Sequence, residues 1–259
     1  MSDASFDDVC EDIDVVIHTA TMDERKIKAD GKTALLINSY GTRQLYLDAE
    51  KNGVEKFIYL STFHVYGKSS GVIDENTEPT PISDYGMTHY FAELYLKQLS
   101  FEGKCKVACI RLTNGVGVPL EGCDKWYLVI NDFCKTLFET GKIVMKSNGL
   151  PLRDFVAIDD VVSAVNVIVN LKAETNFDVY NVSSENSISI RRVAELVLEV
   201  YEEKFMKKGM FEAPTVSKED IDMVKTLYVS SEKLRKCGWR SRTELKCVIE
   251  EIFNHLNSK

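Results

Sequence analysis

The stretch 106-KVACIRL-112 is one of three short apolar runs that decide the fold. The other two are 14-DVVIHTA-20 and 56-KFIYLS-61, and each has the length of a buried strand. The segments between these runs, 32–52 and about 84–100, carry apolar residues at helical spacing. Strands that alternate with amphipathic helices are typical of a parallel α/β sheet. We therefore predict an α/β protein.

Beyond Asn114 the alternation is less regular. The apolar spacing predicts a short extended segment at 153–160, a strand at 178–182, and helices at 125–140, 161–171, 189–204 and 243–257. Residues 68–82 contain Gly71, Pro79 and Pro81 and are predicted to form a loop. Asp159 and Asp160 precede the helix that is expected from residue 161, and we predict that they cap it.

Composition excludes several classes of function. The chain has 259 residues, of which 44% are apolar and 28% charged, and this is typical of a globular protein. Its net charge of −8 argues against nucleic-acid binding, and no apolar run reaches the roughly 18 residues of a membrane helix. The acidic start lacks the basic region of a signal peptide, and the seven cysteines form no CxxC pair. We expect a cytoplasmic protein with reduced thiols, and the four histidines show no metal-ligand spacing.

Six short motifs follow one another along most of the chain. They are DVVIHTA at 14–20, LSTFHVYG at 60–67, YGMTH at 85–89, RLTN at 111–114 with Gly117, RDFV at 153–156 with Asp159-Asp160, and YNV at 180–182 followed by CGW at 237–239. In this order they resemble the extended short-chain dehydrogenase/reductases, specifically the nucleotide-sugar epimerase/dehydratase branch. The resemblance implies a Rossmann-type parallel sheet followed by a small, mixed α/β substrate domain.

The resemblance also implies a division into domains. Residues 1–114, with 161–182 returning to them, correspond to the Rossmann dinucleotide-binding domain of the family. Residues 115–160 and 183–259 correspond to the substrate-binding domain. Family members commonly dimerise through the helix that carries the motif tyrosine. Tyr90, Leu94 and Leu96 are compatible with such a homodimer and equally with core packing.

By resemblance, the catalytic residues are Tyr85, Thr62 and His89. A phenol can both give and take a proton, so Tyr85 is the acid/base at a sugar hydroxyl or ketone, and Thr62 fixes the same oxygen. The implied cofactor is NAD or NADP, with five expected contacts at His18, Ala20, Ser61, Tyr85 and His89. The implied substrate is a nucleotide sugar, with expected contacts at Thr62, Asn114 and Arg153. The planar fork of an arginine suits a diphosphate.

His89 is a departure from the family motif, which has a lysine at this position. The lysine lowers the pKa of the tyrosine one helical turn earlier and binds the nicotinamide ribose. A histidine has a pKa of about 6.5 and a tyrosine one of about 10, so a neutral imidazole leaves the phenol protonated at pH 7. A second departure is Phe63-His64, where a 4,6-dehydratase has an Asp-Glu pair after its threonine.

The largest departure is that the sequence contains no GxxGxxG loop. It begins where the fourth strand of the family begins, so roughly 60 residues of a family member precede this point. The first strand of that fold pairs with the fourth, and without it Val15–Ile17 is expected to be an exposed apolar edge. An incomplete sequence, a partner chain that completes the sheet, and a degenerate paralogue all remain open. The functional alternative is a non-catalytic pseudoenzyme that binds a sugar nucleotide or a protein partner.

Overall fold

The computed structural model describes residue 6 and residues 8–258. Its largest sheet has four parallel strands in the order β1-β2-β4-β8. These strands are β1 (Val15–His18), β2 (Lys56–Thr62), β4 (Lys106–Leu112) and β8 (Phe177–Val182). The predicted α/β fold with a parallel sheet is thus confirmed.

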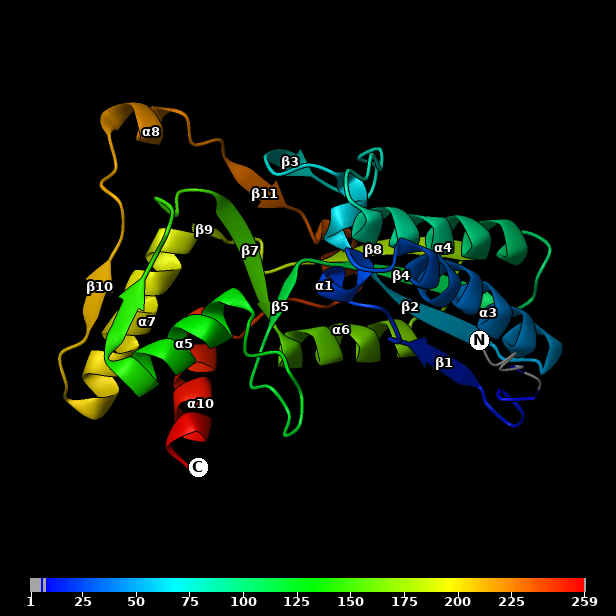
Figure 1. Ribbon diagram of the computed structural model, residues 1–259. Coiled ribbons are helices and arrows are strands. Elements are labelled where there is room, and N and C mark those ends of the chain that lie inside the picture. Colours follow the sequence, from blue (N-terminus) through cyan, green and yellow to red (C-terminus); the bar gives the residue numbers. More distant parts are fainter. Residues whose placement is uncertain (1–5, 7, 259) are drawn as a thin grey trace.

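Helices cover both faces of this sheet (Figure 1). A continuous helical segment and α4 (Asp84–Ser100) cover one face, and α6 (Ile158–Asn170) covers the other. The continuous segment consists of α2 (Gly31–Ala34), the π-helical turn η1 (Leu35–Gly41) and α3 (Thr42–Lys51). Successive strand residues point to opposite faces, so Tyr59 packs on the α3 and α4 side and Ile58 on the α6 side.

A second apolar core lies among α5 (Val129–Thr140), α7 (Ile190–Phe205) and α10 (Leu245–Asn257). Beside it, β7 (Leu152–Ala157) pairs in parallel with β5 (Asn114–Val116) and in antiparallel with β9 (Ser187–Ser189). The strands β6 (Lys142–Val144) and β10 (Met210–Glu212) form a further parallel pair. The remaining short elements are α1 (Glu24–Ile27), η2 (Phe63–Tyr66), β3 (Gly71–Ile73), α8 (Lys218–Asp222), β11 (Leu227–Val229) and α9 (Glu232–Lys236).

Two local predictions are wrong. The segment 68–82 is not a plain loop, because β3 pairs in parallel with β11, with Gly71 opposite Leu227. Asp159 and Asp160 do not cap α6, which begins at residue 158 with Ala157 as its N-cap. The buried carboxylate of Asp160 instead accepts hydrogen bonds from a distant loop: Ser241 Oγ (2.8 Å) and the backbone N–H groups of Arg242 and Thr243 (both 3.0 Å).

The outer edge of β1 is exposed, as predicted. Among the described residues, β2 is the only strand that pairs with β1, and the side chain of Ile17 is 48% exposed. An apolar strand with a free edge is a surface that favours pairing with a further strand. Within the described part of the chain, no helix combines the length and apolarity needed to cross a bilayer.

Candidate active site

The site begins at the close contact between the start of α4 and η2. Ser83 caps α4, and its hydroxyl accepts a hydrogen bond from Gly86 N at 3.2 Å. A side chain at Gly86 would place its Cβ 2.5 Å from the backbone oxygen of His64, so only glycine allows this approach. The contact brings Tyr85, on the first turn of α4, to the carboxyl end of β2. The rings of Tyr85 and His64 lie edge to face, with centroids 5.7 Å apart.

Tyr85 and Thr62 are brought together as the motif predicts. Thr62 is buried at the end of β2, and its side chain interacts with the Tyr85 phenol. Burial raises the pKa of Tyr85, while the interactions with Thr62 and with the ammonium of Lys125 lower it. The net pKa is above the ordinary value, so the phenol holds its proton at neutral pH. The phenol of Tyr85 therefore loses its proton only as the pH rises well above neutrality.

His89 lies one turn further along α4 and is 1% exposed. Its Nδ1 is 2.7 Å from the Tyr59 hydroxyl, and its Nε2 is 3.1 Å from Thr21 Oγ1. Burial lowers its pKa to about 3, with smaller contributions from two other histidines, so the imidazole is neutral. Its ring centroid is 4.6 Å from that of Tyr85. The residue at the lysine position thus contacts the phenol ring but brings no positive charge to it.

His18 and Ser61, two further residues predicted to contact the cofactor, also make hydrogen bonds within the protein. His18 Nε2 is 2.9 Å from Thr42 Oγ1, and burial lowers the pKa of His18 to about 4. Ser61 Oγ donates to the buried carboxylate of Glu93 at 2.5 Å. Ala20, in contrast, lies exposed just beyond the end of β1.

These contacts test whether the described residues fit a dinucleotide. Ligands of parallel α/β sheets bind outside the carboxyl ends of the strands, where Ala20 and Tyr85 lie. The ring nitrogens of His89 already have protein partners, so they are not free to bind ribose hydroxyls. The sequence also contains no GxxGxxG loop for the pyrophosphate. The chain therefore fits the nicotinamide end of NAD(P) in part, through Tyr85 and Ala20.

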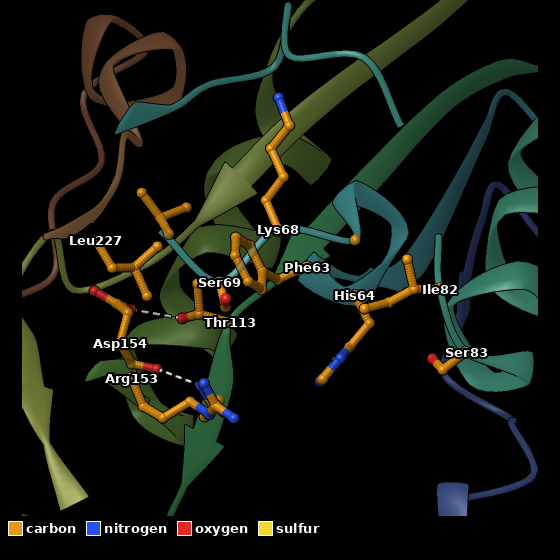
Figure 2. A pocket seen from close by; sticks show the side chains of 13 residues that line it. Phe63, His64, Lys68, Ser69, Ile82, Ser83, Thr113, Arg153, Asp154 and Leu227 are labelled. Atoms are coloured by element: carbon orange, nitrogen blue, oxygen red, sulfur yellow. Dashed lines mark hydrogen bonds between the residues drawn. The ribbon is translucent and has the colours of Figure 1, made fainter. Parts of the chain in front are cut away.

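A pocket lies beside this site, and Arg153 and His64 extend into it from opposite walls (Figure 2). Arg153 is exposed and donates from Nη1 to the backbone oxygen of Leu152 at 3.2 Å. Asn114 also lines the pocket, and its Nδ2 donates to the backbone oxygen of Asp154 at 2.7 Å. Tyr85 and Thr62 are not part of the lining, and His64 connects them to the pocket through its ring contact with Tyr85.

Sequence reasoning missed Asp154, which holds the pocket wall in place. Its carboxylate is 1% exposed and accepts hydrogen bonds from Thr113 Oγ1 (2.7 Å), Ser184 N and Oγ (2.9 and 2.8 Å) and Asn186 N (3.1 Å). These bonds fix the strand that carries Arg153 against two loops. His64 was also missed as a pocket residue, although its position two residues after Thr62 in the motif was a signal. No described residue makes a hydrogen bond to the imidazole of His64.

Comparison with known proteins identifies the family of this chain. A sequence model of the NAD dependent epimerase/dehydratase family matches residues 1–183. The chain is 30% identical over 243 residues to mouse dTDP-D-glucose 4,6-dehydratase, covering 90% of this chain and 64% of the relative. It spans 64–66% of the length of the three mammalian dehydratases that it matches.

Two solved structures show the same fold. UDP-N-acetylglucosamine 4-epimerase from Methanobrevibacter ruminantium, in complex with UDP-N-acetylmuramic acid, superposes with a TM-score of 0.83 at 20% identity, over 99% of this chain and 80% of that one. UDP-glucuronic acid 4-epimerase from Bacillus cereus, in complex with NAD, gives 0.78 at 21% identity, over 96% and 76%. From the match over residues 1–183, together with this fold and the order of its motifs, the chain belongs to the NAD dependent epimerase/dehydratase family.

Proposed function

We propose that the protein transforms a nucleotide sugar as an NAD(P)-dependent epimerase, dehydratase or reductase, with Tyr85 as its acid/base. The observation that carries this proposal is the pairing of Tyr85 with Thr62, next to a pocket that presents the exposed side chain of Arg153. Membership of the family supports the reaction class. Solved relatives with this fold hold UDP-sugars or NAD.

The proton chemistry follows from the environment of the phenol. Tyr85 gives its proton to a sugar ketone or takes one from a sugar hydroxyl, and Thr62 fixes the position of the phenol oxygen. Because burial raises the pKa of Tyr85, removal of the hydroxyl proton becomes faster as the pH rises above neutrality. NAD or NADP, held at the carboxyl end of the sheet beside Tyr85 and Ala20, would supply the hydride acceptor.

The sugar nucleotide is proposed to bind in the pocket of Figure 2. The guanidinium of Arg153 faces the pocket and offers two parallel donors to the diphosphate. Asn114 is held by its bond to the Asp154 backbone and presents its side-chain oxygen to a sugar hydroxyl. In this arrangement residues 1–114 and 161–182 carry the cofactor side, and residues 115–160 and 183–259 close the substrate side.

One observation favours a second candidate, a protein that binds a nucleotide sugar without converting it. His89 is neutral, and both of its ring nitrogens have protein partners, so the cofactor loses a contact on which the family motif relies. The two candidates share the Arg153 pocket and differ in turnover.

Isothermal titration with UDP-glucose, UDP-glucuronic acid and dTDP-glucose tests the shared claim. Arg153→Leu should weaken binding of the preferred ligand roughly 10- to 100-fold, the worth of one or two charge-assisted hydrogen bonds. Arg192→Leu is the matched control, because Arg192 is an exposed arginine on α7 that pairs with Glu199. Equal affinity in wild type and Arg153→Leu, or no binding of any of the three, would contradict the proposal. Chromatography of the same mixtures with NAD separates converting from non-converting protein.

We also propose a homodimer, a partner chain and a cellular location for the protein. Exposed apolar side chains of η1 and α4, among them Leu36, Tyr40, Phe91 and Leu94, support a homodimer through these helices. The free apolar edge of β1 supports pairing with a strand of a partner chain. The absence of disulfides among the described cysteines supports a cytoplasmic location.

A further inference from the structure

Thr21 is an exposed residue whose hydroxyl is held by the buried imidazole of His89. Thr21 Oγ1 lies 3.1 Å from His89 Nε2, and the hydroxyl of Tyr59 lies 2.7 Å from His89 Nδ1. Tyr59 and His89 are each 1% exposed, whereas Thr21 lies in the irregular segment that follows β1. The three side chains therefore form a hydrogen-bonded chain that runs from the interior to the surface.

The direction of this chain follows from the acceptor available to Thr21. The Thr21 hydroxyl donates to the backbone oxygen of Met22 at 3.3 Å, and a carbonyl oxygen can only accept. The oxygen of the same hydroxyl then accepts from His89 Nε2. The imidazole is neutral, because burial lowers its pKa to about 3, so Nδ1 has no proton and accepts from Tyr59. Each hydrogen bond thus points outward, from Tyr59 toward Thr21.

The outer end of the chain lies where a ligand is expected. Thr21 follows Ala20 beyond the carboxyl end of β1, and ligands of parallel α/β sheets bind at this edge. His89 also joins Thr21 to the candidate active site, because the ring centroids of His89 and Tyr85 lie 4.6 Å apart. Thr21 is therefore an exposed hydroxyl at the cofactor side of the site, and its place is fixed by the residue at the lysine position of the motif.

The Thr21 hydroxyl can turn toward a ligand without leaving a polar group unpaired. Its bond to the Met22 oxygen, at 3.3 Å, is longer than the about 2.7–2.8 Å that is typical of hydroxyl donors. Asn38 Nδ2 donates to the same oxygen at 3.4 Å, so this acceptor keeps a partner. Rotation of the hydroxyl moves only its proton, so His89 continues to donate to the Thr21 oxygen. Thr21 thus offers one donor from a fixed position.

We propose that Thr21, held by His89, presents the hydroxyl that contacts the nicotinamide ribose of NAD(P). The resemblance assigns this contact to the side chain of residue 89 itself, but both ring nitrogens of His89 have protein partners. The inference rests on the proposed function, because NAD(P) is the cofactor of that reaction class. Thr21 is then a cofactor-binding residue, and His89 and Tyr59 are positioning residues that act through it.

The test uses nicotinamide mononucleotide, which carries the nicotinamide ribose without the adenosine half of NAD. Binding to the full chain is followed by NMR of ¹⁵N-labelled histidine, and the His89 signals are assigned by their loss in His89→Gln. Thr21→Val should weaken binding roughly 2- to 10-fold, which corresponds to one neutral hydrogen bond, and Thr21→Ser should bind as wild type does. Thr140→Val is the control, because Thr140 is an exposed threonine at the end of α5, and it should also match wild type.

The spectrum without ligand tests the direction of the chain in the same samples. His89 should carry its proton on Nε2, and the mononucleotide should shift the Nε2 signal in wild type and much less in Thr21→Val. A proton on Nδ1 of His89, equal affinity in wild type and Thr21→Val, or no binding by wild type would each overturn the proposal.

The titration needs no turnover, so it separates this proposal from the proposed function. Thr21-dependent binding by a chain that converts no nucleotide sugar would refute the proposed function and leave the assignment of Thr21 standing. Conversion of a nucleotide sugar by a chain that binds the mononucleotide equally well as Thr21→Val would refute the assignment of Thr21 alone.

Discussion

The two deeply buried histidines predict a steep loss of stability in acid. His18 is 8% exposed and His89 is 1% exposed, and burial lowers their pKa values to about 4 and about 3. In the unfolded chain both imidazoles have a pKa of about 6.5. Between these values the unfolded state binds more protons than the folded state, so stability falls as the pH falls. The contribution is intact above pH 6.5 and is lost progressively below it.

The magnitude follows from linkage. Each imidazole loses at most about 1.4 kcal/mol of stability per pH unit, which integrates to about 2.6 kcal/mol between pH 7.5 and pH 4.5 and to about 5 kcal/mol for the pair. A loss of that size is comparable to the whole stability of a typical domain. We expect the protein to be near its unfolding midpoint at pH 4.5 in modest denaturant.

Urea unfolding of wild type and His89→Gln at pH 7.5 and pH 4.5 measures this effect. The free energy of unfolding of the variant is expected to be lower than that of wild type at pH 7.5, because the variant loses the 2.7 Å hydrogen bond between His89 and Tyr59. Between pH 7.5 and pH 4.5 the free energy of unfolding should fall by about 2.7 kcal/mol less in the variant than in wild type. Carboxylates contribute equally to both proteins and cancel in this comparison. Equal acid losses in the two proteins would refute the neutral, buried state of His89.

Three further outcomes are expected. Arg111→Met should cost about 3–5 kcal/mol in urea unfolding, because it leaves Glu93 buried without the cation that lies 2.7 Å away; a cost below 1 kcal/mol would contradict this account. Gly86→Ala should cost about 1–3 kcal/mol, since its Cβ would meet the backbone oxygen of His64; unchanged stability would show that the helix start can move. His89→Lys should raise turnover at neutral pH and move the pH–rate profile to lower pH, and an unmoved profile would show that no charge reaches the phenol from this position.

The main sheet could be predicted from sequence because its signals are local. Each strand is a short apolar run, and each helix between strands carries its own apolar periodicity. The pairing of β3 with β11 could not be predicted, because it joins three-residue strands about 150 residues apart and depends on the folded positions of both. The prediction that Asp160 caps a helix was wrong for a related reason. An acidic residue near a helix start favours a cap, but tertiary structure uses this carboxylate to fix residues 241–243.

The site also contains some contacts that local sequence predicts and others that depend on the folded structure. Motif spacing placed Tyr85 beside Thr62, because both lie at fixed offsets from the end of one strand and the start of one helix. Motif spacing could not predict the hydrogen-bond partners of His89. Tyr59 points toward α4 only because of the strand register, and Thr21 lies in an irregular segment.

The central claim is that Tyr85 moves a proton on a bound nucleotide sugar. The most direct measurement is the rate of product formation from UDP-glucose, UDP-glucuronic acid and dTDP-glucose, with NAD present, by wild type and Tyr85→Phe across pH 6 to 9. Wild type is expected to convert one of these sugars at a rate that rises with pH, and Tyr85→Phe should be slower by roughly 100- to 10,000-fold. Equal rates in the two proteins, or no conversion by wild type at any pH, would contradict the claim.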